Sequence, residues 1–239
     1  MKRRTLIVST VKLLHGSDHI IKTPQLSLGR KHNDYGRGFY CTQIPEMARE
    51  WACKNNNDGF VNEYSFNTKG LKVINLFDGN YTVLNWIGLL LKNRLFTLQD
   101  EIAIDARNYV VENFALDLSG YDVVIGYRAD DSFFSYAESF VSNTLPLRSL
   151  NQALYLGKLG MQTVLISEKA FNQIEFINSE TVDKEEYYTK FNDRDRNTRS
   201  TYQKELKQKH SYKDDIFVMD ILREGIKNDD PRIQRIVFE

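Results

Sequence analysis

Apolar and polar positions follow two different periods along the chain, which predict a mixture of strands and helices. Runs rich in Val, Ile, Leu, Thr and aromatic residues predict strands over residues 5–14, 38–42, 61–66, 71–77, 121–126 and 161–167. Asn-Thr-Lys-Gly at residues 67–70 is typical of a turn, so the third and fourth strands are expected to form a hairpin. Residues 121–126, YDVVIG, are almost continuously apolar, which predicts a strand buried on both faces.

Apolar residues at intervals of three and four predict helices between these strands. The predicted helices cover residues 46–54, 81–94, 98–114, 132–142, 147–160 and 168–173. Pro45 favours a helix start at that point, because a first helical turn tolerates proline.

The C-terminal part has a different character. Residues 184–209 are dense in charge and almost free of Leu, Ile and Val, whereas residues 214–226 regain an amphipathic pattern. We therefore expect one domain over residues 1–175 and a charged, mostly helical extension over residues 176–239, packed on or beside it.

Composition excludes several classes of partner. Lys plus Arg and Asp plus Glu are equal at 32 each, so no global field attracts a nucleic acid or a membrane surface, and neither is expected as a partner. The two cysteines, Cys41 and Cys53, have no metal-ligand spacing, so no metal site is expected. They suit a reducing compartment, the alternative being a single disulfide.

The N-terminal sequence MKRRTLIVSTVKLL starts like a signal peptide, with basic residues before an apolar run. Ser9, Thr10 and Lys12 interrupt that run, and no small-residue cleavage site follows, so we recognise no cleavable signal peptide. A cytoplasmic protein, or one delivered into the cytoplasm of a target cell, is expected.

Residues 15–51 bring together groups that suit a flat heteroaromatic ring. His15 and Ser17 offer polar atoms to the edge of such a ring and to a ribose, and Tyr40 and Trp51 offer faces for stacking. The alternative is an ordinary strand, turn and strand followed by a core helix, with His15 a satisfied buried histidine.

Three motifs in this order resemble a little-characterised bacterial family of the diphtheria-toxin and poly(ADP-ribose) polymerase clan. They are HGS at residues 15–17, DYGRGFYCT at 34–42 with an aromatic residue eleven positions after Tyr40, and DVVIGYRADD at 122–131. The likeness covers roughly residues 13–170. It implies an α+β fold with an ADP-ribosyltransferase-like split or mixed β-sheet core, peripheral helices and a helical C-terminal segment.

The resemblance also implies roles for individual residues. His15 would contact the nicotinamide ribose, and Tyr40 and Trp51 would sandwich the nicotinamide, although the family usually has tyrosine where Trp51 stands. Gly16, Ser17 and Gly38 belong to the same binding motifs. Arg30 lies where the family has an arginine, and its planar fork suits a pyrophosphate, the alternative being a solvated basic loop.

The catalytic carboxylate is the main departure from the family. On the late strand the position that resembles the catalytic glutamate is Gln162, whose amide can bind a ribose hydroxyl but carries no charge. Asp130 and Asp131 are the first acidic candidates, with helix N-capping as their alternative role. Glu138 is the next, with an ordinary exposed helix glutamate as its alternative, and Glu63 comes too early in the chain.

The resemblance therefore implies a mono-ADP-ribosyltransferase that uses NAD+ as co-substrate and modifies a protein acceptor, as a bacterial toxin or effector does. Plain NAD+ hydrolysis is one alternative. A catalytically weak module that binds NAD or ADP-ribose is another, and Gln162 favours it. An antitoxin or immunity protein is a further partner that fits a toxin.

Overall fold

A computed structural model describes residues 10–98, 100–129, 131–150, 160–207 and 213–234. Its strands form two sheets. The first sheet has the order β1 (Thr10–Ser17), β3 (Gly59–Asn67), β7 (Ile174–Val182), and both of its strand pairs are antiparallel. The second has the order β2 (Phe39–Cys41), β6 (Met161–Leu165), β5 (Val123–Tyr127), β4 (Val73–Asn75), and only β4 and β5 run parallel.

Helices surround these sheets. They are α1 (Pro45–Cys53), α2 (Val83–Asn93), α3 (Glu101–Phe114), α4 (Asp131–Val141), α6 (Glu168–Phe171), α7 (Lys184–Lys207), α8 (Val218–Arg223) and α9 (Pro231–Gln234), with a 3-10 turn at Leu26–Leu28. Pro45 occupies the first turn of α1, and a capping box of Thr82 and Asn85 starts α2. The predicted mixed α+β fold with peripheral helices is confirmed.

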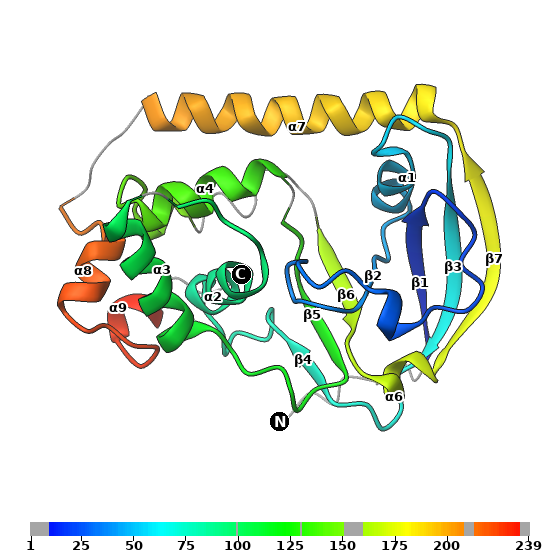
Figure 1. The fold of residues 1–239 in the computed structure, drawn as a ribbon, viewed down its shortest axis with the longest axis horizontal. Coiled ribbons are helices and arrows are strands. Elements are labelled where there is room, and N and C mark those ends of the chain that lie inside the picture. The colour runs from blue at the N-terminus through cyan, green and yellow to red at the C-terminus, as the bar shows by residue number, and fades with distance from the viewer. Residues whose placement is uncertain (1–9, 99, 130, 151–159, 208–212, 235–239) are drawn as a thin grey trace, which may run out of the picture.

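The two sheets pack against each other through an apolar layer. Leu13, Tyr64 and Phe66 from the first sheet meet Phe39 and Leu165 from the second. The other face of the second sheet is covered by a larger core built mainly from α2, α3 and α4, whereas α1 packs on the outer face of the first sheet. In Figure 1, α2, α3 and α8 lie at the left, the second sheet lies in the middle and the first sheet lies at the right.

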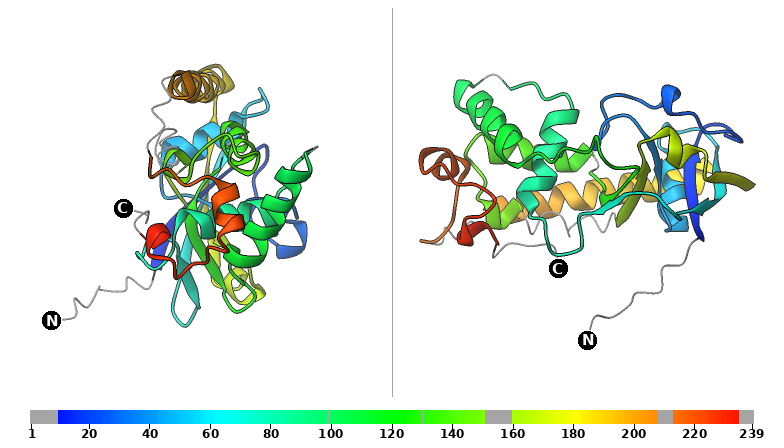
Figure 2. Two further views of the ribbon diagram at one scale, coloured as in Figure 1. Left: turned by 90° about the vertical axis from the view of Figure 1, so that its left-hand side faces the viewer. Right: turned by 90° about the horizontal axis from the view of Figure 1, so that it is seen from below.

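Helix α7 extends along one side of the molecule, past α1 at its start and α4 farther along (Figure 1). The two turned views in Figure 2 show the same helix lying outside the sheets. Among the described residues, no helix combines the length and the apolar character needed to cross a membrane.

One expectation about strand pairing is wrong, and one strand was not predicted. β3 and β4 do not form a hairpin, because β3 is the central strand between β1 and β7, and β4 pairs with β5 in the other sheet. Strand β7 was not predicted, because its solvent-facing positions obscure the alternation in IEFINSETV. The boundary expected between residues 175 and 176 consequently falls inside β7.

Residues 151–159 of the helix expected at 147–160 lie outside the described residues, as do residues 5–9 of the first expected strand.

Candidate functional site

The two sheets meet at one short bridge between β1 and β2. Leu14 and Thr42 exchange both backbone hydrogen bonds, at 2.8 and 2.9 Å, and within the described residues this is the one bridge between the two strands. Backbone groups of a strand point to alternate sides, so the N–H and C=O of Gly16 point to the same side as those of Leu14. The N–H and C=O of Gly16 therefore lie on the β2 side of β1, past the last backbone hydrogen bond that the described residues make between the two strands, and this region is called the gap below.

Gly16 also allows α1 to approach β1. A Cβ built on Gly16 would lie 2.0 Å from the carbonyl oxygen of Ala48 and 2.8 Å from Cβ of Trp51. No side chain fits in this space. The glycine of the HGS motif therefore lets α1, which carries Trp51, pack closely on the face of β1.

His15 is held as a neutral imidazole at the same gap. Its Nδ1 lies 2.7 Å from the carbonyl oxygen of Tyr40, which can only accept, so Nδ1 carries the proton and Nε2 keeps its lone pair. The ring stacks on Phe39 with centroids 4.4 Å apart. Burial is the main cause that lowers the pKa of His15 to about 4, with Lys54 and His19 adding smaller repulsions.

The Tyr40 ring is fixed by its hydroxyl. That hydroxyl donates to the carbonyl of Gly36 at 2.7 Å and accepts from the backbone N–H of Tyr35 at 3.0 Å. Gly36 has a φ of +79°, in the left-handed region that favours glycine. Because burial raises the pKa of Tyr40, the residue offers an aromatic face and not a proton donor that titrates near neutrality.

Gln162 belongs to a buried network and not to an open ribose site. It is 2% exposed, and its amide nitrogen donates to Asp34 Oδ2 at 2.9 Å and to the carbonyl of Tyr127 at 3.0 Å. Asp34 also accepts from Arg94 at 2.8 Å and from the backbone N–H of Ala129 at 3.0 Å. The two hydrogens of its amide are therefore used inside the protein, and the ribose contact of Gln162 stays a prediction.

This network explains the DYG part of the second motif. Asp34 is 3% exposed and joins α2, β5 and β6 through its hydrogen bonds. Tyr35 donates its hydroxyl to the Tyr127 carbonyl at 2.8 Å, and a Cβ on Gly126 would collide with that hydroxyl at 2.1 Å. Sequence reasoning missed Asp34 and Arg94 as a pair, because 60 positions separate them in the chain.

The Ser17 hydroxyl is likewise engaged within the protein. It donates to the carbonyl of His19 and accepts from the amide of Asn62 at 3.0 Å. Asn62 is fully buried and also accepts from the backbone N–H of Ile21 at 2.9 Å. These contacts shape the loop after β1, and the role of the Ser17 hydroxyl as a ligand contact stays a prediction.

Gly38 and Arg30 lie in the loop that leads to β2. A Cβ on Gly38 would lie 2.7 Å from the carbonyl oxygen of Leu165, so this glycine lets β2 approach β6 and is not placed as a ligand contact. Arg30 is exposed, and in the part of the chain that the structure describes its guanidinium makes no ion pair. It is therefore available to an anion.

Trp51, the predicted second stacking face, is half-buried on α1. The guanidinium carbon of Arg128 lies 4.2 Å from the centroid of its ring. Arg128 follows β5, so this contact brings the polar segment after β5 to the gap between the sheets. Sequence reasoning placed Arg128 in that segment but gave it no role.

The acidic candidates are not brought to the gap by any described contact. Asp130 lies outside the described residues, and Asp131 begins α4 with its side chain outside them. Glu138 is exposed on α4, as its alternative role predicts. Glu63 pairs with Lys12 at 2.7 Å on the first sheet.

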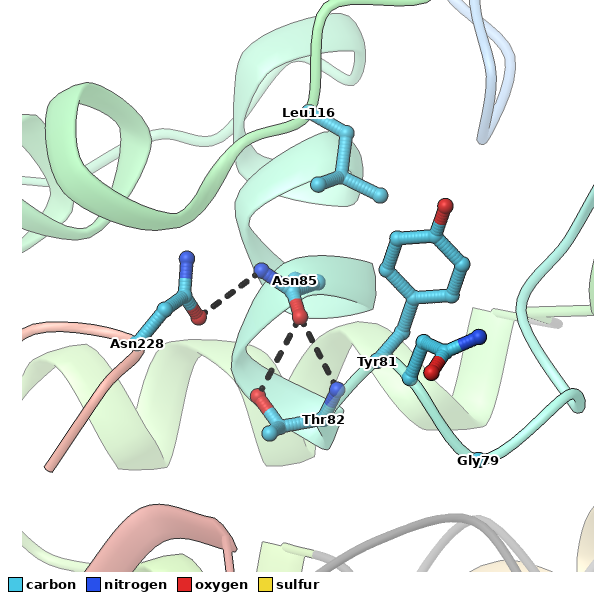
Figure 3. A pocket seen from close by; sticks show the side chains of 7 residues that line it. Gly79, Tyr81, Thr82, Asn85, Leu116 and Asn228 are labelled. Carbon is cyan, nitrogen blue, oxygen red and sulfur yellow. Dashed lines mark hydrogen bonds between the residues drawn. The ribbon is translucent and has the colours of Figure 1, made fainter. Parts of the chain in front are cut away.

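A separate hollow of about 440 Å³ lies at the start of α2. Figure 3 shows that its polar side chains bond one another: Asn85 donates to Asn228 at 3.0 Å and accepts from the backbone of Thr82 at 2.9 Å. None of the predicted site residues lines it. The hollow is therefore part of the helix cap and its support by the C-terminal segment.

Within the described residues, no group of three or more His, Cys, Asp or Glu side chains is arranged to hold a metal ion. Cys41 and Cys53 are buried free thiols, and burial raises the pKa of Cys41.

Comparison with known proteins assigns the chain to a family whose function is unknown. Residues 11–176 match the model of a family described as "Protein of unknown function (DUF3990)", so the chain belongs to that family. No curated protein and no solved structure matches the chain.

Proposed function

We propose that this member of the DUF3990 family is a mono-ADP-ribosyltransferase that transfers ADP-ribose from NAD+ to a protein. The open backbone edge of Gly16 carries this proposal. A carboxamide such as that of nicotinamide has one N–H donor group and one C=O acceptor, which match the C=O and N–H that Gly16 directs into the gap. The split between β1 and β2 that creates this edge also supports an ADP-ribosyltransferase-like core.

The side chains around the gap fit the rest of the nicotinamide riboside. Tyr40 and Trp51 come from different layers and supply aromatic faces on which a flat ring stacks. His15 keeps Nε2 as a neutral acceptor, which suits a hydrogen bond from a ribose hydroxyl. Arg30, exposed in the preceding loop, is the cation we assign to the pyrophosphate.

Transfer breaks the bond between the ribose C1′ and the nicotinamide nitrogen, and the electron pair leaves with nicotinamide. The acceptor nucleophile then bonds to C1′ and loses its proton. A carboxylate would stabilise the positive charge that develops on the ribose. Since Gln162 is held by Asp34 and Tyr127, we assign that role to Asp131 or Asp130 after β5, and to Glu138 only after them.

A catalytically weak module that binds NAD or ADP-ribose is the second candidate, and the Gln162 network favours it. The strand position nearest to the bridge carries an amide, and its side chain is buried among donors and acceptors of the protein. Such a chain would bind NAD+ without turnover. Plain hydrolysis of NAD+ would consume it without labelling a protein.

One experiment separates these candidates. Purified protein is incubated with NAD+ labelled in the adenylate part, with and without cell lysate, and nicotinamide release, free ADP-ribose and protein label are measured. Transfer to a protein predicts label on protein, and hydrolysis predicts free ADP-ribose without lysate. A binding module predicts a raised melting temperature with no products.

His15→Ala serves as the matched variant in this experiment, with Lys31→Ala as a control in the exposed loop. We expect His15→Ala to remove turnover while the circular dichroism spectrum stays unchanged. If wild-type protein neither binds nor consumes NAD+, the proposed function is wrong.

A further inference from the structure

The guanidinium of Arg128 covers one face of the Trp51 indole. At 4.2 Å from the ring centroid, the contact is well within the range in which an aromatic face attracts a cation. Arg128 reaches the indole from the end of β5, in the sheet that also contains Tyr40. A ring that stacks on this face of Trp51 would therefore have to displace Arg128.

The same turn of α1 packs against Gly16. The Cβ of Trp51 is one of three atoms that a Cβ on Gly16 would meet, at 2.8 Å, with Ala48 O and Ala52 N closer still. A ring at Gly16 that stacks on the indole face covered by Arg128 thus needs the space that the guanidinium fills. The nicotinamide ring of NAD+ is itself cationic, so it would also be repelled by the guanidinium at this distance.

We propose that Arg128 is a gating residue that sets the affinity and the charge preference of the nicotinamide position. This inference rests on the proposed function. In the ligand-free protein the guanidinium occupies the indole face, and the ring of NAD+ binds after Arg128 has moved aside. Arg128 therefore weakens binding of a cationic ring more than that of a neutral ring, because only the cationic ring also meets like-charge repulsion.

The test compares Arg128→Met with Arg196→Met. Methionine keeps an unbranched chain and removes the charge, and Arg196 is a matched control because its side chain is 76% exposed on α7. Dissociation constants are measured by calorimetry for NAD+, for the cation 1-methylnicotinamide and for neutral nicotinamide. From the usual strength of such contacts we expect Arg128→Met to bind NAD+ about 2- to 30-fold more tightly, with no change in the control.

The gain should be larger for 1-methylnicotinamide than for nicotinamide. A second measurement uses the protein without ligand. Acrylamide should quench the tryptophan fluorescence of Arg128→Met more strongly than that of the wild type. Trp86, the other tryptophan, is 1% exposed and contributes little to quenching, so the change reports on Trp51.

Equal affinity of the wild type and Arg128→Met for NAD+ would overturn the gating role and leave the proposed function standing. Equal gains for the charged and neutral rings would overturn the charge preference. If neither protein binds any of the three probes, the proposed function fails and the gating role fails with it. Arg128→Gln also removes the charge, and it is measured in the same way in case the methionine variant does not fold.

Discussion

At the scale of single residues, the Asp34 carboxylate shows how a polar residue of a sequence motif stabilises the fold. It is nearly fully buried and receives hydrogen bonds from Arg94, Ala129 and Gln162. Buried carboxylates are tolerated where a cation and several donors surround them. The amide at position 162 is one of these donors, and a carboxylate there would be a poor replacement.

Gln162→Glu is therefore expected to destabilise the protein near pH 7. The introduced carboxyl would face Asp34 Oδ2, which lies 2.9 Å from the present amide nitrogen, so its folded-state pKa should rise above the unfolded value. A rise of about 2–3 pKa units corresponds to roughly 3–4 kcal/mol. The penalty is absent below about pH 4, where the introduced carboxyl is protonated in both states, and grows as the pH rises.

Urea unfolding of the wild type and Gln162→Glu at pH 4 and pH 7 checks this expectation. Gln162→Met, which removes the donor without adding charge, is the control. Equal stability of Gln162→Glu and the wild type at pH 7 would show that the network does not hold position 162.

His15 gives a second expectation at this scale, because its pKa is lowered to about 4. A histidine with a lowered folded-state pKa binds fewer protons than the unfolded chain. Its contribution to stability is therefore fully present above about pH 6.5 and is lost as the pH falls from there through about 4. The ¹⁵N chemical shifts of the ring should show a neutral Nδ1–H tautomer at pH 6, and a charged imidazolium at that pH would contradict the burial argument.

At the scale of elements, α7 supports the helix that carries Trp51. Arg194 on α7 donates from Nε to Glu50 Oε2 on α1 at 2.7 Å, and both side chains are largely buried. Tyr187 and Tyr188 of α7 pack on the small core beneath α1. The charged sequence of α7 therefore includes the largely buried ion pair of Arg194 with Glu50, beside two tyrosines that pack on the core.

Arg194→Met should cost stability, because it leaves the buried Glu50 carboxylate without its cation. Breaking a buried pair costs about 3–5 kcal/mol, and the partial exposure of Arg194 reduces our expectation to about 2–4 kcal/mol. Arg196→Met, at an exposed position two residues away, should change stability by less than about 0.5 kcal/mol. Guanidinium unfolding checks both values, and equal losses would show that the Glu50 pair contributes nothing specific.

At the scale of the whole molecule, the family match at residues 11–176 ends inside β7. The rest of β7 completes the first sheet along Gly59–Glu63 of β3. Val182, near its end, belongs to the core under α1. The part of the chain after residue 176 is thus integral to the sheet that carries His15.

A chain that ends at residue 176 should consequently fail to unfold cooperatively, because β3 loses its partners on the β7 side from Gly59 to Glu63 and keeps only β1 there. A chain that ends at residue 183 keeps β7 and should retain the sheet, with lower stability because α7 is absent. Circular dichroism melting distinguishes the two truncations. A cooperative transition of the shorter chain near the wild-type temperature would contradict this account.

The sequence alone determined the local elements that have a strong period or a clear start signal. Pro45 located α1, and the apolar periodicity located α2, α3 and α4, because helix contacts are short-range. The continuous apolar run of β5 and the motif residues His15 and Tyr40 were also identified from sequence, and the structure places these two residues in hydrogen-bond contact.

Only the tertiary structure decided which strands pair and what each polar group meets. β3 and β4 are neighbours in sequence but lie in different sheets, since strand pairing depends on long-range packing and not on the turn between them. Gln162 bonds Asp34 across 128 positions, and Arg128 reaches Trp51 from another layer. Sequence shows which groups exist, but their roles depend on partners that folding alone brings within a few ångströms.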